Sequence, residues 1–470
     1  MAATATKIGQ SGLTFDWTNL KANPEIPHEP TLQAAWQTLK GRFESNEIGF
    51  YNLPVTAELN QKSEAVALAK RILEAEHCTD VLFLGIGGSS LGPISLLSAL
   101  REKVSSKLKF HFAENPDPIE CAQTLKKLIP SQTLVCVVTK SGGTYETLAL
   151  ALIALGWSGE ARWSSHFVAI TDPKKGDLRK FATEKNIPTL AIHPSIGGRF
   201  SVLTPVGLFA AALAGLDCDE LIKGAQHVRE YCEKAPLVKN PLMTLGAELI
   251  RQFGKRPIHV CMPYSTCLRE WADWFVQLWS ESLGKNSKGF TPIAAVGATD
   301  QHSILQLLRD GPDNKITFFI AVDEVAEPVV IPKEVQGLSF QGYPAFSILR
   351  GNTLQQLLKT EYQATSLVLT KQSRPNLTVK IDSLNERNIG SLYFAFSVLT
   401  AVTGTLWDIN PFDQPGVEEG KLYIQSTLEK NGAGSSSQSF GANNISGDDD
   451  DQNSAVYRLR TLAQKTQLES

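Results

Sequence analysis

The sequence predicts an α/β protein with two doubly wound, mainly parallel β-sheets flanked by helices. Short unbroken apolar segments, such as residues 134–138, have the composition of strands buried on both faces of a parallel sheet. Segments with helical periodicity separate them, which is the order of elements in doubly wound folds. Two of the apolar segments also run directly into loops of glycine, serine and threonine, at the strand ends where such sheets bind ligands.

The elements fall into two series along the chain. The first series has five expected strands, at residues 81–84, 108–112, 134–138, 166–170 and 189–192. After a helical link, the second series has four expected strands, at residues 258–262, 293–296, 316–322 and 367–369. Long helices are expected at residues 267–283 and 388–405, the first with a buried stripe that includes Trp271 and Trp274.

These series predict the domain boundaries. The expected parts are an N-terminal arm packed on the first domain (residues 1–60), the first domain (61–216), the second domain (217–430), and an acidic low-complexity linker with a C-terminal segment (431–470). The stretch 431–451 is rich in Gly, Ser and Asn and ends in four aspartates. It lacks the apolar residues that would offset the entropy of ordering, so we expect a disordered linker there.

Composition argues against several classes of protein. A length of 470 residues is too great for one ordinary core. A net charge of −3 gives no reason to expect nucleic acid or an anionic membrane as a partner. The seven cysteines form no CxxC pair, which suits free thiols in a reducing cytoplasm. The N-terminal residues lack the apolar segment of a signal peptide. No run approaches about 18 consecutive apolar residues, so we expect no membrane span.

The stretch TLVCVVTKSGGTYET, residues 133–147, has the character of an anion site. An apolar strand leads into a loop that carries Thr139, Lys140, Ser141 and Thr144, and a helix follows. Free amides and the positive end of a helix dipole favour an anion at such a junction, and the hydroxyls add donors. Because the GxxxxGK[ST] pattern is absent, we expect a small phosphate monoester rather than a nucleotide. The alternative is an ordinary strand-to-helix turn capped by Ser and Thr.

A second loop of this kind lies at GIGGSSLGP, residues 85–93, and carries Gly88 and Ser89. It resembles a dinucleotide fingerprint only loosely, because the GxGxxG spacing is not met. A tight strand-to-helix turn is the other interpretation of this loop.

Six motifs together resemble one family. They are GIGGSSLGP (85–93), TKSGGTYET (139–147), GGRFS (197–201), QLWSESLGK (277–285), DQH (300–302) and DQPGVEEGK (413–421). Their residues and their order are similar to those of the glucose-6-phosphate isomerase family in its shorter bacterial form. The resemblance covers residues 81–421, most of the chain.

The resemblance implies a fold and a reaction. The fold is two sugar-isomerase subdomains, and the assembly is a cytoplasmic homodimer with active sites at the interface. The reaction is the reversible interconversion of glucose 6-phosphate and fructose 6-phosphate through an enediolate, in glycolysis and gluconeogenesis. No metal and no cofactor take part in it.

The resemblance also implies roles for individual residues. Glu281 matches the catalytic base, Arg199 the arginine that holds the oxygens of the intermediate, and Lys421 the lysine near the ring oxygen. His302 matches a ring-opening residue that the family takes from the partner subunit. The residues matched to substrate binding are Gln277 and Gln414 for the sugar, Ser141 and Thr144 with Thr139 and Lys140 for the phosphate, and Gly88 and Ser89 in the neighbouring loop.

These residue types suit the reaction. A carboxylate fixed on a helix, such as Glu281, can take a proton from C2 and return it at C1. The forked donors of Arg199 suit the negative charge of an enediolate. His302 and Lys421 suit the proton transfers of ring opening. Taken singly, each has an ordinary alternative as a solvated helix-end carboxylate, a turn arginine, a structural histidine or a surface lysine.

Three other functions stay open at this point. One is isomerisation of another sugar phosphate, such as mannose 6-phosphate, with the same pair Glu281 and Arg199. Another is a phosphosugar-sensing regulator without catalysis, which would not need Glu281, Arg199, His302 and Lys421 together. The last is nucleotide binding at the Gly85 loop.

Overall fold

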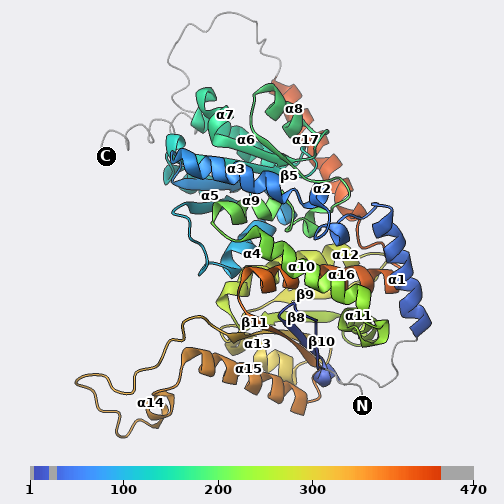
Figure 1. Cartoon of the computed structure of the whole chain (residues 1–470), viewed down its shortest axis with the longest axis vertical. Helices are drawn as coiled ribbons and strands as arrows, with labels where there is room; N and C mark the ends of the chain where they lie inside the picture. Colours follow the sequence, from blue (N-terminus) through green and yellow to red (C-terminus); the bar gives the residue numbers. More distant parts are fainter. Residues whose placement is uncertain (1–4, 21–28, 436–470) are drawn as a thin grey trace, which may run out of the picture.

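The computed structural model describes residues 5–20 and 29–435 of the chain. These residues form two β-sheets, each with helices on both faces, and the two sheets share a layer of helices between them (Figure 1). This arrangement confirms the predicted α/β class with two mainly parallel sheets. The helices are α1 (Glu29–Glu44), α2 (Ala57–Asn60), α3 (Lys62–Ala75), α4 (Leu91–Ala99), α5 (Pro118–Lys126), α6 (Tyr145–Ser158), α7 (Trp163–His166), α8 (Asp177–Glu184), α9 (Pro205–Leu213), α10 (Cys218–Lys234), α11 (Pro241–Gln252), α12 (Arg269–Leu283), α13 (Gln301–Asp310), α14 (Pro344–Leu349), α15 (Leu354–Lys371), α16 (Glu386–Leu406) and α17 (Glu418–Ser435).

The first sheet is entirely parallel and has the strand order β4-β3-β5-β6-β7. Its strands are β3 (Asp80–Leu84), β4 (Lys109–Ala113), β5 (Thr133–Thr139), β6 (Phe167–Thr171) and β7 (Thr189–Ala191). All five were expected from their apolar composition. Every residue of β5 is buried, as the unbroken apolar run predicts for a central strand.

The second sheet has six strands in the order β1-β2-β11-β10-β8-β9. Its strands are β1 (Ala5–Lys7), β2 (Leu13–Asp16), β8 (Ile258–Pro263), β9 (Thr291–Ala294), β10 (Lys315–Glu324) and β11 (Asn376–Ser383). The pairs among β8, β9, β10 and β11 are parallel, whereas β2 pairs antiparallel with β11 and with β1.

One strand expected in this sheet is wrong. Residues 367–369 lie inside α15, which begins with a capping box between Thr353 and Gln356. A run of three apolar residues does not distinguish a strand from a buried turn of helix. The strand of the sheet is β11, whose first four residues are buried.

The position expected for the N-terminal arm is also wrong in part. β1 and β2 extend the second sheet rather than packing on the first domain. The later part of the arm reaches the first domain, where Gly49 N–H donates to Ser195 O and the rings of Phe50 and Phe200 stack at 4.8 Å.

Residues alternate between layers along the strands. In β3, Val81 and Phe83 belong to the large central core, whereas Leu82 and Leu84 face the outer helices of the first sheet. In β10, Phe318 joins the same central core and Phe319 the outer core of the second sheet. The two sheets therefore share one hydrophobic core, which fixes one domain against the other.

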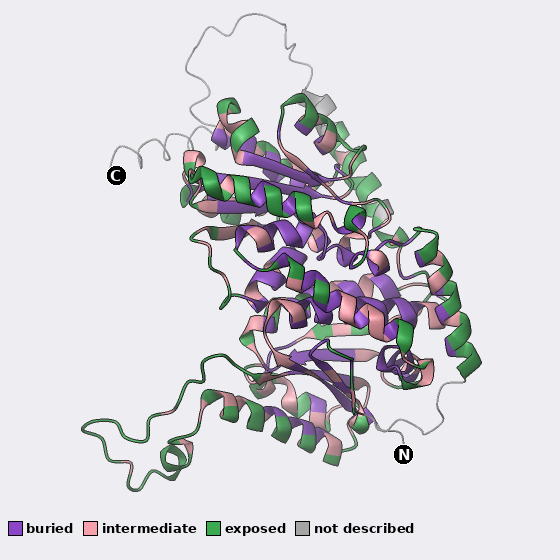
Figure 2. Cartoon of the chain, in the orientation of Figure 1, coloured by how far each residue is buried: buried purple, intermediate pink, exposed green. Residues whose placement is uncertain are grey.

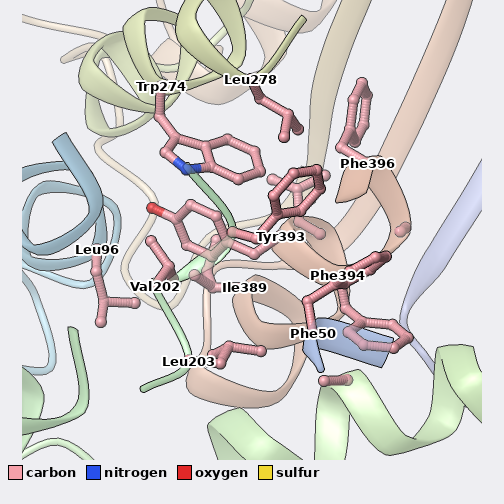
Figure 3. Packing of buried hydrophobic residues seen from close by; sticks show 14 of the residues in the cluster. Phe50, Leu96, Val202, Leu203, Trp274, Leu278, Ile389, Tyr393, Phe394 and Phe396 are labelled. Carbon is pink, nitrogen blue, oxygen red and sulfur yellow. The ribbon is translucent and has the colours of Figure 1, made fainter. Parts of the chain in front are cut away.

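Aromatic side chains fill the middle of this core (Figure 3). The ring of Trp274 on α12 meets Tyr393 on α16 edge-on at 4.7 Å, and Tyr393 Oη shares a 2.7 Å hydrogen bond with Ser95 Oγ on α4. The Trp271 and Trp274 stripe is buried as its spacing predicts. The helix that carries the candidate base is therefore held rigidly.

Among the described residues, α16 is the one helix with the length and hydropathy of a membrane span. However, 89% of the relevant window is buried inside the protein. α16 packs against α10, α11 and α12, so it serves as a core helix.

Two segments stand away from the body. Residues 325–352, between β10 and α15, project as a long excursion that carries α14 and is mostly exposed (Figures 1 and 2). Its residues that are more than half exposed include Val329, Val330, Leu338, Tyr343, Phe346 and Ile348. α17 likewise exposes Leu422 and Tyr423.

The linker expected at residues 431–470 lies mostly outside the described residues. α17 continues to Ser435, so the first residues of that linker are helical.

Candidate active site

The loop between β5 and α6 gathers three hydroxyl groups at the carboxyl end of the first sheet. Thr139 Oγ1 lies 2.8 Å from Thr144 Oγ1, and Ser141 Oγ lies 3.4 Å from each of them. α6 begins at Tyr145, directly after the cluster, so its unpaired amides and the positive end of its dipole lie beside these hydroxyls. Hydroxyl and amide donors together suit an anion.

The second glycine loop reaches the same edge of the sheet. Gly87 has a φ of +57°, a left-handed conformation that favours glycine. Gly88 approaches the backbone of Gly198 and Arg199 so closely that a Cβ atom would overlap it. The turn η3 (Gly87–Ser89) therefore packs directly against the turn η6 (Gly198–Phe200).

Arg199 is the most completely fixed polar side chain of the site, with only 1% of its side chain exposed. Its donors reach four acceptors, which are Ser282 Oγ at 2.7 Å, Gln414 Oε1 at 2.5 Å, Pro411 O at 2.7 Å and Asp413 O at 2.9 Å. These contacts join the turn η6, the end of α12 and the segment before α17.

Glu281 lies in the last turn of α12 and faces the arginine. Its Oε2 atom is 3.5 Å from Arg199 Nη1 and accepts a hydrogen bond from Gln277 Nε2 at 3.2 Å. Burial lowers the pKa of Arg199, and Glu281 is the first of the carboxylates that oppose this shift. The Glu281 side chain is 23% exposed, so the carboxylate is held by donors and still open to a small molecule.

His302 and Lys421 lie apart from this cluster on exposed surface. His302 is the second residue of α13, and no described contact joins its side chain to Glu281 or Arg199 within residues 5–20 and 29–435. Its neighbours are anchored, since Gln301 Oε1 accepts from Tyr264 Oη at 2.6 Å and Asp300 Oδ2 from Val296 N–H at 2.6 Å. Lys421 is exposed in the first turn of α17.

Comparison with known proteins identifies the family. The sequence model of the family described as phosphoglucose isomerase matches residues 55–446. A glucose-6-phosphate isomerase of Rubrobacter xylanophilus is 41% identical over 441 residues, which are 89% of this chain and 99% of the relative. One from Thermus thermophilus is 38% identical and covers 85% of this chain and 95% of its own length.

The chain belongs to the phosphoglucose isomerase family.

Solved structures agree with this assignment. The crystal structure of a hypothetical protein from Thermus thermophilus superposes with a TM-score of 0.80 at 36% identity, covering 88% of this chain and 99% of that one. A glucose-6-phosphate isomerase from Chlamydia trachomatis has the same fold, with a TM-score of 0.76 at 23% identity over 91% of this chain and 90% of its own. The two sheets are therefore the two sugar-isomerase subdomains of the family.

The fold brings most of the expected site residues together. Glu281, Arg199, Gln277 and Gln414 are linked by direct contacts, and Thr139, Ser141 and Thr144 form one cluster. Gly88 lies against the arginine turn. In the single chain, His302 and Lys421 are the two expected catalytic residues that lie on exposed surface.

Lys140 has a different environment from its hydroxyl neighbours. It borders a cavity of about 240 Å³ that Gly197, Phe200 and Asp413 also line. Burial lowers the pKa of Lys140, Asp172 opposes this shift, and the positive charge of Arg199 adds to it. Lys140 therefore adds positive charge where the hydroxyl loop borders this cavity.

Sequence reasoning missed the role of Lys285. Its Nζ donates to Asn410 O at 2.5 Å and Asp413 O at 2.8 Å, and pairs with Asp413 Oδ1 at 3.0 Å. Burial lowers the pKa of Lys285, and Asp413 opposes this shift. Lys285 thus ties the end of α12 to the segment that carries Gln414. The available signal was its place four residues after Glu281 in the same motif.

Proposed function

We propose that this chain catalyses the reversible interconversion of glucose 6-phosphate and fructose 6-phosphate, with Glu281 as the base. The observation that carries the assignment is the Glu281 carboxylate, 3.5 Å from Arg199 Nη1 and held on a rigid helix within a member of the phosphoglucose isomerase family. Aldose–ketose isomerisation moves one proton between neighbouring carbons, and a single positioned carboxylate can take and return it.

Arg199 stabilises the charge that develops during the transfer. When the proton leaves C2, negative charge gathers on the oxygens of the enediolate. A guanidinium that four protein acceptors hold in place needs no reorganisation at that moment, which is the condition for effective electrostatic stabilisation. Gln277 and Gln414 contact Glu281 and Arg199, respectively, and we assign them to the sugar hydroxyls.

The hydroxyl cluster binds the phosphate. Ser141 and Thr144 donate to its oxygens, with Thr139 and Lys140 beside them and Gly88 and Ser89 in the neighbouring loop. Hydrogen bonds to an ionised group are roughly twice as strong as neutral ones. Binding the remote phosphate positions the reacting carbons against Glu281.

The active protein is a homodimer whose partner supplies His302 to each site. Three observations support this assignment. His302 is exposed at the start of α13, next to the anchored Asp300, and Lys421 is exposed on α17. Both α17 and the projecting segment carry large exposed apolar side chains. Exposed apolar patches of this kind mark interaction surfaces, and a two-fold interface would use each patch twice.

In such a dimer His302 and Lys421 would transfer the protons that open the sugar ring. For the chain itself, we assign residues 61–216 and 217–430 to the two subdomains, because each range holds one sheet apart from the β1–β2 edge. We place the reaction in the cytoplasm, in glycolysis and gluconeogenesis.

The direct test is to supply the full-length chain with fructose 6-phosphate, without added metal, and to measure glucose 6-phosphate. Mannose 6-phosphate in a parallel assay distinguishes the proposed substrate pair from that of a broader phosphosugar isomerase. Turnover of fructose 6-phosphate that Glu281→Gln removes and Glu270→Gln keeps supports the assignment. Glu270 is a suitable control because it lies on the same helix, where it accepts from Ser98. No turnover by the folded dimer overturns the assignment.

A further inference from the structure

An unassigned cluster of ligating side chains lies at the edge of the first sheet opposite the active site. His77 and Cys78 lie in the loop between α3 and β3, and His166 ends α7 just before β6. The strands of this sheet are parallel, so their amino ends share one edge and their glycine loops the other. The cluster is therefore separate from the isomerase chemistry.

The three side chains converge on one point. One ligand-type atom from each of His77, Cys78 and His166 lies within 4.8 Å of the other two. The two imidazole rings meet edge-on, with their centroids 4.8 Å apart. All three residues are half-buried, so the point is sheltered and still within reach of an ion from solvent.

The hydrogen bonds of this cluster leave one ring nitrogen, His77 Nε2, without a partner in the described part of the chain, whereas both ring nitrogens of His166 have one. His77 Nε2 is buried and has no hydrogen-bond partner among the described residues, although buried polar atoms are nearly always paired. His166 Nε2 lies 3.1 Å from Ser131 O, and its Nδ1 lies 2.8 Å from Ser165 Oγ. A backbone carbonyl at one ring nitrogen is the usual support of a metal-binding imidazole. His166 would then ligate through Nδ1, and the ion would displace the Ser165 hydroxyl from that nitrogen.

We propose that His77, Cys78 and His166 bind Zn²⁺ through three protein ligands, with water in the fourth position. Two imidazoles and one thiolate are ligands that zinc favours. Zn–N bonds of about 2.0 Å and Zn–S bonds of about 2.3 Å place tetrahedral ligand atoms roughly 3.3–3.6 Å apart. The longest of these separations, up to 4.8 Å, must therefore shorten by roughly 1.2–1.5 Å, a movement that side-chain torsions provide.

Binding changes the protonation of the site. The ion replaces the thiol proton of Cys78, which passes to solvent as the Zn–S bond forms. The ion then joins the loop before β3 to the helix before β6. This link restrains the first domain without entering the reaction, so the isomerase remains active without zinc.

The experiment is a Zn²⁺ titration of the chelator-treated, full-length chain in competition with a chromophoric chelator. We expect one tight equivalent per chain. Cys78→Ser and His77→Gln should each weaken this equivalent at least about 10-fold, because even supporting residues of metal sites have effects of that size. Cys121→Ser and His227→Gln are matched controls outside the cluster and should change nothing.

A second measurement uses Co²⁺ in place of Zn²⁺. The unsubstituted chain should show a thiolate-to-cobalt absorption band that Cys78→Ser lacks, while isomerase activity reports that both proteins are folded. Zinc binding by the unsubstituted chain that is no tighter than binding by Cys78→Ser overturns the proposal. If Cys78→Ser loses activity, the cobalt spectrum of the unsubstituted chain decides, and absence of the thiolate band overturns the site.

Discussion

The two halves of the candidate active site differ in how they are held. Arg199 is 1% exposed, with every nitrogen of its guanidinium hydrogen-bonded within the chain, and Glu281 faces it from a helix packed into the central core. His302 and Lys421 lie on exposed surface. The first half is organised by one chain alone, whereas the second half has the exposure expected of groups that act across an interface.

This difference follows from what each half does. Stabilising an enediolate requires positive charge that is already in place, so the guanidinium of Arg199 is buried and held by protein acceptors. Ring-opening groups need only reach the substrate, and exposed first turns of helices, such as those of α13 and α17, can carry them to a neighbour.

Glu281→Gln should have the largest effect on turnover. The amide keeps the shape and hydrogen bonding of the side chain but cannot take a proton, so kcat should fall at least about 100-fold. Binding of a sugar phosphate, followed by calorimetry, should persist. Near-normal turnover by the folded variant would remove Glu281 from this role.

Mixing two inactive variants tests the shared site. His302→Ala and Glu281→Gln each lack one group, and subunit exchange should restore activity to about a quarter of the sites by random pairing. In the control, His227→Ala takes the place of His302→Ala. His227 lies away from the site, with its Nδ1 3.1 Å from Gln10 O. If mixed dimers form and no activity returns, His302 acts within its own chain.

Lys285→Met should loosen the segment that carries Gln414. The change removes the hydrogen bonds from Lys285 Nζ to Asn410 O and Asp413 O. The segment that holds acceptors of Arg199 is then less firmly fixed. We expect kcat to fall about 10-fold, equivalent to about 1.4 kcal/mol, with a smaller change in KM. Lys285→Arg should recover part of the loss, and a variant with altered KM alone would contradict a positioning role.

Thr144→Ala should weaken the binding of sugar phosphates by about 1 kcal/mol, or roughly fivefold. One donor to the phosphate is lost while the sugar contacts remain, so weak binding of unphosphorylated sugar should hardly change. Thr183→Ala is the matched control, because that hydroxyl donates to Arg179 O on α8 outside the loop. Equal losses for phosphorylated and free sugar would place the phosphate elsewhere.

Removing residues 436–470 should have the smallest effect. Both Gln414 and Lys421 precede this segment, so kcat/KM in a coupled assay should be unchanged. Truncation before Glu418 is the informative comparison, since it removes Lys421 with α17 and should abolish most activity. A large loss from the shorter truncation would assign a catalytic or structural role to the last residues.

Local sequence was enough for elements with one clear signal. The run at residues 134–138 predicted a fully buried strand, and β5 is one. It was not enough where a short apolar run suits either a helix or a strand, and residues 367–369 belong to α15 rather than to the expected strand. The partner of β2 could not be predicted either, because β11 lies more than 300 residues further along the chain.

For the candidate site, the sequence alone determined which chemical groups are present and which loops carry them. Glycines at 87 and 88, hydroxyls at 139, 141 and 144, and a carboxylate near a helix end are local properties that spacing reveals. Only the tertiary structure decided that Gly88 meets the backbone of Gly198, that Arg199 reaches Pro411 and Asp413, and that Lys285 ties that segment to α12. These contacts join segments some 100 to 200 residues apart, and packing of the shared core, rather than any local preference, sets the distances between them.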